Sequence, residues 1–467
     1  MLPPASPAQR GRESPLLMMI CRAAAALAVL ALAACPPVRG PGAARVADQT
    51  VEIGRPGAAL SGVAGDGAVV FAALTVRPPD PPSASPASPR GRAAAASTVI
   101  EALRPSRGAT PIWRAELPGY GGPLVASGTH VLAALGGAGS VAGLAMRGDP
   151  GAVVAALDAA TGAVAWKLAI DATEWAVITQ LAATADGALV GGSFAGTLRI
   201  ADKIVSSAGG SDGFAARLVG ERVAWLVRVG GPGADAIHAI AAAGDRIAIA
   251  GTFNAGADLL GEPLLPLDER SSRSDGFVAE LDPSGARRWV QSFGGKDDDA
   301  VAGVAIDAAG RIAVAATARG TVRIAATELT ASGPADGLVA WWDGRGTALS
   351  AVLVGGADFD GLRAIASAGE RVLVAGFYSG AIRLGNLALT AGGGDDAFIA
   401  ELDASGAVVQ AWPVGGDGRE EVTALAAVPG GFIAGVAHTA AARIGDAALP
   451  APADPTSGAA IAVRAAP

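Results

Sequence analysis

The chain has 467 residues, of which 51% are hydrophobic but only 4% aromatic, together with 66 glycines and 30 prolines. This length suits two to four ordinary domains or one large repeat domain, and the composition favours packed sheets joined by many turns. A formal charge of −8 without basic clusters argues against a nucleic-acid-binding protein.

The first 34 residues are typical of an export signal. Basic residues precede "AAAALAVLALAAC" (23–35), an apolar run too short to span a bilayer as a helix. The run ends in "LAAC", which resembles the bacterial lipobox, and this resemblance implies cleavage before Cys35 and lipidation of that cysteine. An ordinary secretory signal cut at an A-x-A-like site is the alternative. Translation can start at any of three methionines: Met1, Met18 or Met19.

The two cysteines and the residue after Cys35 indicate where in the cell the protein is expected to be. Cys21 and Cys35 are the only cysteines, so a processed and lipidated chain has no disulfide. A short linker, 35–44, follows the lipid site, and Pro36 in place of an aspartate favours export to the outer membrane, on either of its sides. No later segment approaches 18 uninterrupted apolar residues, so we expect the lipid to be the only membrane anchor.

The body of the chain is periodic. Four stretches align at steps of 64, 61 and 60 residues. They are "VGGPGADAIHAIAAAGDRIAIAGTF" from Val229, "FGGKDDDAVAGVAIDAAGRIAVAAT" from Phe293, "VGGADFDGLRAIASAGERVLVAGFY" from Val354 and "VGGDGREEVTALAAVPGGFIAGVAH" from Val414. A second motif, such as "SDGFVAELDPSGARRW" from Ser274, recurs between them. A fixed period of this size indicates a solenoid or a propeller.

Each repeat is predicted to hold four short strands. In the unit that starts near residue 230 these are 236–242, 246–253, 276–281 and 286–293, with "DPSG" (282–285) as the last hairpin turn. Four strands in about 60 residues, with a Gly-Gly step to the next unit, predict a propeller blade.

The same pattern extends over the whole body as seven units. Their predicted bounds are 57–117, 118–170, 171–229, 230–293, 294–354, 355–414 and 415–467. The first unit contains a low-complexity loop, 77–97, that we expect to be disordered.

The two ends of the body complement each other. The last unit is one strand short, whereas "DQTVEIG" (48–54) precedes the first unit as an orphan strand. We therefore predict an all-β, seven-bladed β-propeller of four-stranded antiparallel blades over 45–467, closed by this strand in the last blade. An open solenoid leaves both ends unexplained, and an array of sandwiches requires linkers that the units lack.

The body resembles the quinoprotein-like and SBBP-type propeller repeats of bacteria. The likeness is carried by "GGxxxD", "GTF" and "SDGFVAxLDxxGxxxW", and it implies this architecture. "ALDAATGAVAW" (156–166) also matches the docking motif of quinoprotein propellers, but aligned with "AELDPSGARRW" (279–289) it becomes strand, turn, strand and a packing tryptophan. We expect one such tryptophan per unit to fill the wedge between neighbouring sheets, at Trp113, Trp166, Trp225, Trp289 and Trp412.

Acidic residues recur beside the Gly-Gly loops. Asp235, Asp299, Asp360 and Glu420 share one repeat position, with Asp297, Asp298, Asp358 and Asp417 beside them. Capping of backbone N–H groups is the first interpretation. A ligand-binding rim at the channel mouth, formed by the first set with His238, is the second. A calcium site is the third, for which Asp358, Asp360, Asp298 and Asp299 are the candidates, although no complete calcium loop exists.

The sequence offers no recognisable catalytic motif. His130, His238 and His438 belong to distant units without metal-ligand spacing, and we place His438 in a connection and His238 in a channel-lining strand. There is no G-x-S-x-G elbow, and "GAGSVAG" (137–143) lacks the lysine of a phosphate loop, so we assign it to a flexible connection. We therefore expect no catalytic residue and no cofactor, with calcium as the only ion to consider.

The sequence is best interpreted as a non-enzymatic, membrane-anchored propeller lipoprotein that binds or scaffolds partners in the cell envelope as a monomer. The partner is a protein or an envelope polymer. One version of this interpretation resembles the lipoprotein propellers that assist outer-membrane protein assembly, which implies peptide docking. A hydrolase or lyase that uses His238 at the channel mouth is one alternative, and a quinone-dependent dehydrogenase is another.

Overall fold

The computed structural model describes residues 49–52, 58–66, 68–76, 96–104, 110–267, 273–449, 451–452 and 458–465. The chain divides into two compact parts, residues 1–44 and residues 45–467, and the second part contains the repeat units. The predicted signal peptide, Cys35, the linker and residues 77–95 of the predicted disordered loop lie outside the described residues. The described part of the chain contains 38 strands, and it has no helix long and apolar enough to cross a membrane.

The strands follow the predicted repeat. Four main strands occur in each of the first six units, and the last unit has three of its own. The first three units contain β2 (Ala58–Gly65), β3 (Val70–Val76), β4 (Ser97–Leu103), β5 (Trp113–Pro118); β6 (Tyr120–Ser127), β7 (His130–Gly137), β10 (Gly151–Asp158), β11 (Val164–Ala172); and β12 (Trp175–Thr184), β13 (Gly187–Ile200), β14 (Lys203–Val219), β15 (Arg222–Gly230). The next three contain β16 (Ala236–Ala243), β17 (Arg246–Phe253), β20 (Asp275–Leu281), β21 (Arg287–Gly295); β22 (Ala300–Ile306), β23 (Ile312–Ala318), β26 (Asp336–Trp342), β27 (Ala348–Val354); and β28 (Asp360–Ala368), β29 (Arg371–Tyr378), β32 (Asp396–Leu402), β33 (Val408–Gly416). The last unit contains β34 (Glu420–Val428), β35 (Gly431–His438) and β38 (Gly458–Ala465).

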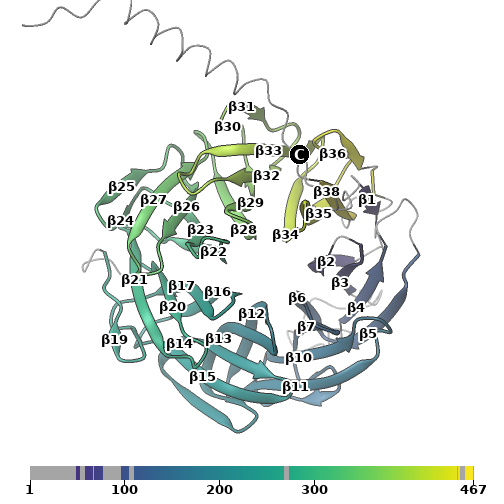
Figure 1. The fold of residues 1–467 in the computed structure, drawn as a ribbon, viewed down its shortest axis with the longest axis vertical. Coiled ribbons are helices and arrows are strands. Elements are labelled where there is room, and N and C mark those ends of the chain that lie inside the picture. The colour runs from purple at the N-terminus through teal and green to yellow at the C-terminus, as the bar shows by residue number, and fades with distance from the viewer. Residues whose placement is uncertain are drawn as a thin grey trace, which may run out of the picture. The chain divides into compact units, whose positions relative to one another are not determined.

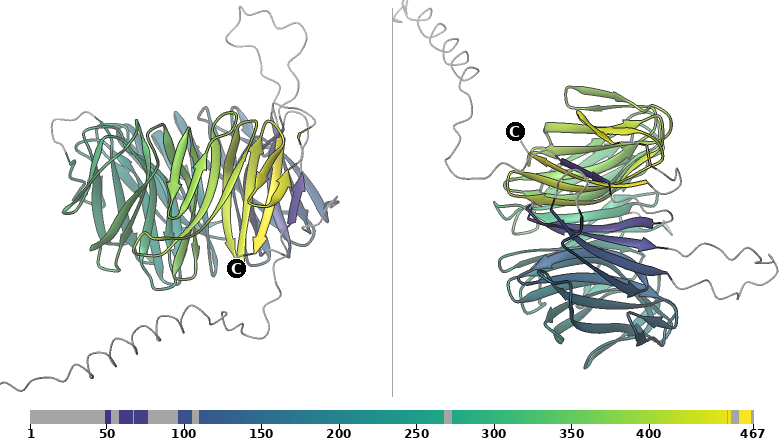
Figure 2. Two further views of the ribbon diagram at one scale, coloured as in Figure 1. Left: turned by 90° about the horizontal axis from the view of Figure 1, so that it is seen from above. Right: turned by 90° about the vertical axis from the view of Figure 1, so that its right-hand side faces the viewer.

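Within the unit 45–467 the sheets are arranged around a central opening, with the first strand of each unit innermost (Figure 1). All ladders between named strands are antiparallel, as the hairpin turns require. The first unit begins after β1 (Gln49–Glu52), which pairs with β38 in the register Gln49↔Val463 to Glu52↔Ala460. β1 therefore lies in the sheet of the last unit, beside strands from the other end of the chain (Figure 2).

The sequence predicts four-stranded sheets throughout, but the sheets of the structure differ in size. They comprise three four-stranded, two six-stranded, one ten-stranded and two two-stranded sheets. The extra strands are short hairpins in the connection between the second and third strands: β8 (Ser140–Val141) and β9 (Leu144–Ala145), β18 (Asp258–Leu259) and β19 (Glu262–Pro263), β24 (Thr321–Ile324) and β25 (Thr327–Thr330), β30 (Ala381–Leu384) and β31 (Leu387–Thr390), β36 (Ala442–Ile444) and β37 (Ala447–Leu449). β18, β24 and β36 each pair with the fourth strand of the preceding unit, so they bond neighbouring units together. "GAGSVAG" thus contains a hairpin strand, not a free loop.

The hydrophobic core lies between neighbouring sheets. Each of seven buried clusters combines residues of two units. One of them joins Leu60 and Leu74 of the first unit to Val428, Ile433 and Ile461 of the last. Because the second and third strands of each unit are covered on both faces, they form nearly continuous apolar runs rather than alternating ones, and the small side chain of alanine lets the sheets approach closely.

Tryptophans of the fourth strands pack on the next unit, as the repeat predicted. The Trp225 indole donates from Nε1 to the Pro283 carbonyl oxygen at 3.0 Å, and Trp113 donates to the Ala159 carbonyl oxygen at 2.9 Å. Gly285 follows in the same turn with φ +85°, and a Cβ there would lie 2.8 Å from the Trp225 ring. Both the left-handed conformation and the indole contact therefore require glycine.

Candidate binding site in the central channel

The first strand of every unit contains a β-bulge at the same place. The ladder register shifts between Leu60 and Gly62, and at the equivalent position in the six other units. We call the residues at these bulges the channel belt: Ser61, Pro123, Thr179, His238, Ala302, Arg363 and Thr423. A bulge turns one extra side chain away from the regular alternation, and bulges are enriched next to functional sites.

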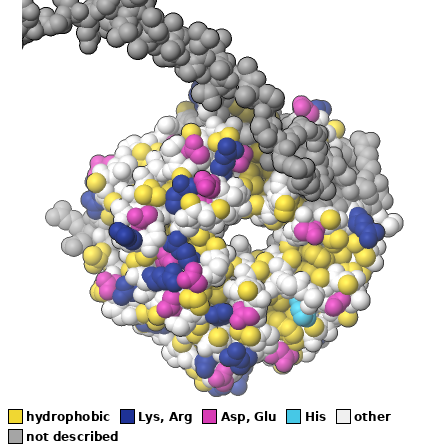
Figure 3. All heavy atoms as spheres, viewed as in Figure 1, with side chains coloured by type: hydrophobic (Ala, Val, Ile, Leu, Met, Phe, Trp, Pro, Cys, Tyr) yellow, Lys and Arg dark blue, Asp and Glu magenta, His cyan; other side chains and the backbone are white. Residues whose placement is uncertain are grey.

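All seven channel-belt residues line one cavity of about 240 Å³. The cavity lies among the innermost strands β2, β6, β12, β16, β22, β28 and β34, and the space-filling view shows the opening at the centre of the molecule (Figure 3). Seven segments distant in sequence thus contribute to one concave site, which is typical of ligand-binding positions in proteins.

The hydroxyl groups of the channel belt compensate for the bulges. The Ser61 hydroxyl donates to the Ala73 carbonyl oxygen at 3.1 Å, and Thr423 donates to Gly435 at 3.4 Å. Thr179 donates to the carbonyl oxygens of Gly191 (3.1 Å) and Ile237 (2.7 Å), the second of which belongs to the next unit. Because a bulge interrupts the backbone ladder, these hydroxyls satisfy carbonyls on the neighbouring strand. The belt is therefore held in a fixed conformation.

His238 occupies the bulge of β16 and lies in the channel. Its Nε2 is 2.9 Å from the Thr252 hydroxyl, and burial lowers the pKa of the imidazole. Burial disfavours the charged form, so His238 is neutral near pH 7 and acts as a hydrogen-bonding group.

Arg363 is the charged residue that sequence reasoning missed. Its guanidinium lies over the Phe377 ring, 4.7 Å from the ring centroid, and its Nε is 3.3 Å from Glu421 Oε1. The Phe377 ring contacts the Phe359 ring at a centroid distance of 5.6 Å, and Arg319 lies 5.9 Å from the Phe359 centroid. The repeat alignment contained a signal for Arg363: it is the only arginine at this repeat position, and a residue that departs from its repeat is a candidate for function.

The four repeated acids do not form a solvent-facing rim, which corrects the second interpretation of the sequence. Asp235, Asp299, Asp360 and Glu420 are at most 4% exposed. The physical reason is backbone capping: Asp235 accepts the N–H groups of Gly231 and Asn254, both at 2.7 Å. His238 lies in the channel belt, so the structure separates it from these carboxyl groups.

Each of these acids faces a second buried acid from the third strand of the preceding unit. The partners are Asp212, Asp275, Asp336 and Asp396. The first glycine of the Gly-Gly motif leaves room for the pair: a Cβ on Gly294 would lie 2.3 Å from Asp275 Oδ1 and 2.9 Å from Asp299 Oδ2. The repeated "GGxxxD" and "SDGF" motifs therefore encode one contact between units.

Burial and the like charge of the partner raise the pKa of these acids. Burial raises the pKa of Asp299 to about 7 and that of Asp360 to about 6, and the negative charge of nearby carboxylates adds to this effect. Burial and the contact with Asp396 also raise the pKa of Glu420. Both Glu420 oxygens and Asp396 Oδ1 lack a hydrogen-bond donor unless one carboxyl is protonated. One proton shared by the pair would satisfy one Glu420 oxygen and Asp396 Oδ1, which favours a protonated pair over two ionised carboxylates.

The side chains of the calcium candidates are buried or contact other parts of the protein. Asp298 accepts from the Arg273 guanidinium at 2.6 Å and from the Ser274 N–H at 3.1 Å, while Asp299 and Asp360 are buried. Asp358 lies against Gly380, where an added Cβ would meet its carboxylate oxygen. Among the residues that the structure describes, no three His, Cys, Asp or Glu side chains are grouped so that they could hold a metal ion.

The two other histidines lie in different surroundings. His130 begins β7, next to Thr129. His438 ends β35 opposite Glu420, which corrects its predicted place in a connection; it is 2% exposed and its Nδ1 is 2.9 Å from the Ala440 carbonyl oxygen.

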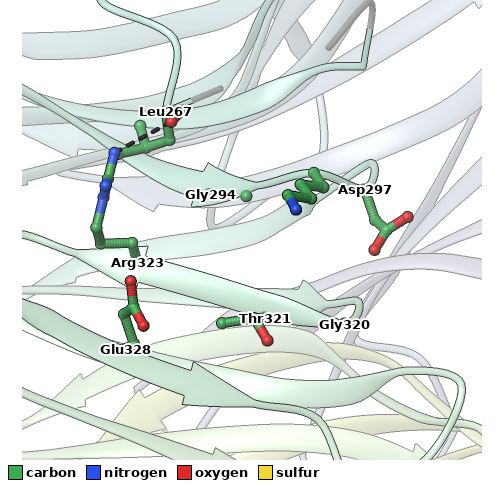
Figure 4. A pocket seen from close by; sticks show the side chains of 9 residues that line it. Leu267, Gly294, Asp297, Gly320, Thr321, Arg323 and Glu328 are labelled. Atoms are coloured by element: carbon green, nitrogen blue, oxygen red, sulfur yellow. Dashed lines mark hydrogen bonds between the residues drawn. The ribbon is translucent and has the colours of Figure 1, made fainter. Parts of the chain in front are cut away.

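A second cavity, of about 550 Å³, lies at the loop between the fourth and fifth units (Figure 4). It is lined by the Gly294–Gly295 backbone and by charged side chains of both signs: Lys296, Asp297, Arg323 and Glu328. The Arg323 guanidinium donates to the Leu267 carbonyl oxygen at 3.1 Å. The charges balance, so this cavity favours no ligand charge over the other.

Comparison with known proteins finds likeness among solved structures alone. No protein-family model and no curated protein sequence matches the chain. Similar solved structures are propellers. BamB from Moraxella catarrhalis is 15% identical with a TM-score of 0.40, covering 87% of this chain and 85% of that one. Quinohemoprotein alcohol dehydrogenase from Comamonas testosteroni is 13% identical with a TM-score of 0.39, covering 89% and 76%. The propeller domain of the Trilobed protease from Pyrococcus furiosus is 10% identical with a TM-score of 0.41, covering 81% and 89%.

Proposed function

We propose that the protein is a non-enzymatic binding module whose ligand enters the central channel. The observation that carries this proposal is the channel belt: seven bulges at one repeat position place seven residues at the lining of one cavity. A bulge weakens the ladder, and hydroxyls of the belt compensate for that cost. A regular first strand would build the same core, so the repeated bulge is best explained by a selected channel surface.

We further propose that 45–467 is a closed seven-bladed propeller. Two observations support closure: the pairing of β1 with β38, and the hydrophobic cluster that joins the first unit to the last. A closed ring leaves no long unpaired sheet edge and holds the channel belt in a fixed geometry.

In the cell, we propose that this module is a lipoprotein of the envelope, anchored through Cys35 in the outer membrane. The support is the lipobox-like "LAAC" and Pro36 that follows it. The partner is a protein or an envelope polymer, part of which reaches the channel.

The separation of His238 from the acids supports binding over catalysis. The hydrolase or lyase alternative would be favoured by His238 lying beside Asp235 or Asp299. Both carboxyls are instead buried at unit junctions, where they cap backbone N–H groups. In "ALDAATGAVAW", Asp158 accepts from the N–H groups of Ala160 and Thr161, so the motif serves a turn.

A photo-crosslinking amino acid at Ala302 should capture the natural ligand in native membranes. Ala302 has a small side chain in the channel belt, so the probe reaches the cavity without removing a polar contact. Leu349, 49% exposed on β27 and outside the channel lining, is the matched control. We expect a crosslinked product at Ala302 and none at Leu349, measured by mass spectrometry. Equal products at both positions, or none at Ala302, would contradict a channel ligand.

A further inference from the structure

We propose that the channel belt binds an oxyanion, the carboxylate or phosphate group of a small acid, with the Arg363 guanidinium as its principal contact. This inference rests on the proposed function, because it assigns the chemistry of the ligand that enters the same channel.

The first support is the charge of the cavity. Its lining contains the Arg363 guanidinium, the His238 imidazole and the amide of Gln180. No aspartate or glutamate belongs to this lining. In a chain of net charge −8, a cavity with a cation and no lining carboxylate is a local exception that favours an anion.

The second support is how Arg363 is held. The Phe377 ring covers the guanidinium from one side, and Phe359 supports Phe377 from behind. Glu421, just outside the cavity lining, contacts the Nε edge at 3.3 Å. In the described part of the chain, neither Nη atom of Arg363 forms a hydrogen bond, and the side chain is 48% exposed. The two Nη groups are therefore available as a planar fork, which matches a carboxylate or a phosphate bidentately.

The third support is preorganisation. An arginine on a flexible loop loses side-chain entropy when it binds, whereas Arg363 is already oriented by an aromatic face and one carboxylate. Glu421 neutralises part of the charge, so the site favours a geometrically matched oxyanion over a simple halide. A cavity of about 240 Å³ has room for a small acid or the end of a chain, but not for a folded domain.

Isothermal titration calorimetry with the full chain tests this site, using malonate and inorganic phosphate as separate probes. We expect saturable binding of at least one probe, and Arg363→Gln should weaken it at least tenfold. Arg363→Lys keeps the charge but loses the fork, so its affinity should be intermediate. Binding of malonate alone assigns a carboxylate ligand, and binding of phosphate alone assigns a phosphate ligand.

Arg371→Gln is the matched control. Arg371 is also 48% exposed and also 3.3 Å from one carboxylate, that of Glu401, but it does not line the cavity. Its variant should bind like the parent. Equal binding by Arg363→Gln and the parent, or no saturable binding of either probe, would overturn the anion site. Crosslinking at Ala302 would still succeed in that case, so the failure of the anion site is distinguishable from failure of the proposed function.

Discussion

Replacing Glu420 by glutamine should stabilise the protein at pH 8 and reduce the dependence of its stability on pH. The glutamine amide has the shape of a protonated glutamate, and it can donate to Asp396 Oδ1, which lacks a donor when both carboxyls are ionised. We expect the free energy of unfolding at pH 8 to rise by about 1–2 kcal/mol, because each unit of a raised pKa corresponds to about 1.4 kcal/mol. Urea unfolding at pH 5 and pH 8 measures this.

The direction of the pH dependence follows from the raised pKa values. Asp299, with a pKa of about 7, and Asp360, with a pKa of about 6, bind protons more tightly in the folded protein than in the unfolded chain, where the pKa is 3.8. This contribution to stability is complete below pH 4 and is lost as the pH rises to 7. Exposed turn aspartates such as Asp282 have lowered pKa values and act in the opposite direction, but only near and below pH 4. The parent should therefore be more stable at pH 5 than at pH 8.

An exposed glutamate provides the control for charge. Glu116 on β5 accepts from the Ser97 hydroxyl at 2.7 Å and its side chain is 56% exposed. Glu116→Gln removes the same formal charge without touching an acid pair, so stability should change by less than about 0.5 kcal/mol and the pH dependence should be unchanged. If Glu420→Gln is less stable than the parent at pH 8, the pair does not share a proton.

The repeat made the main strands predictable from the sequence. The predicted strand 246–253 coincides with β17, and the predicted strand 236–242 is one residue shorter than β16. This worked because turn residues recur at fixed offsets and the second and third strands of each unit are apolar on both faces. Burial of Asp235 and its relatives was not predictable, since an aspartate before a strand caps a turn equally well in solvent and at a buried junction.

The short outer hairpins were missed although a signal exists. "LRIADKIV" (198–205), "VRIAATEL" (322–329), "IRLGNLAL" (382–389) and "ARIGDAAL" (442–449) align around two turn residues, and the structure places a hairpin at each. The strands flanking each turn are only three or four residues long in the last three, too short for periodicity to stand out. The bulges left no signal at all, because an extra residue is defined only by the register of the neighbouring strand.

Disrupting β1 should have a large effect on stability, because this strand is the proposed closure of the ring. Successive residues of an edge strand direct their N–H groups alternately toward and away from the partner strand. The double substitution Thr50→Pro/Val51→Pro therefore removes a donor to β38 whichever residue faces it. We expect a loss of about 2–4 kcal/mol, from a few backbone hydrogen bonds worth about 1 kcal/mol each and from the exposed edge of β38.

Hydrogen exchange locates the damage caused by the prolines. The amides of β38 should exchange faster in the variant. Those of β17, which belongs to the fourth unit and does not contact β1, should keep their protection. If the β1 prolines alter neither the unfolding free energy nor exchange in β38, then packing between the first and last units holds the ring without the strand. In that case the cluster of Leu60 with Ile461 would be the closure instead.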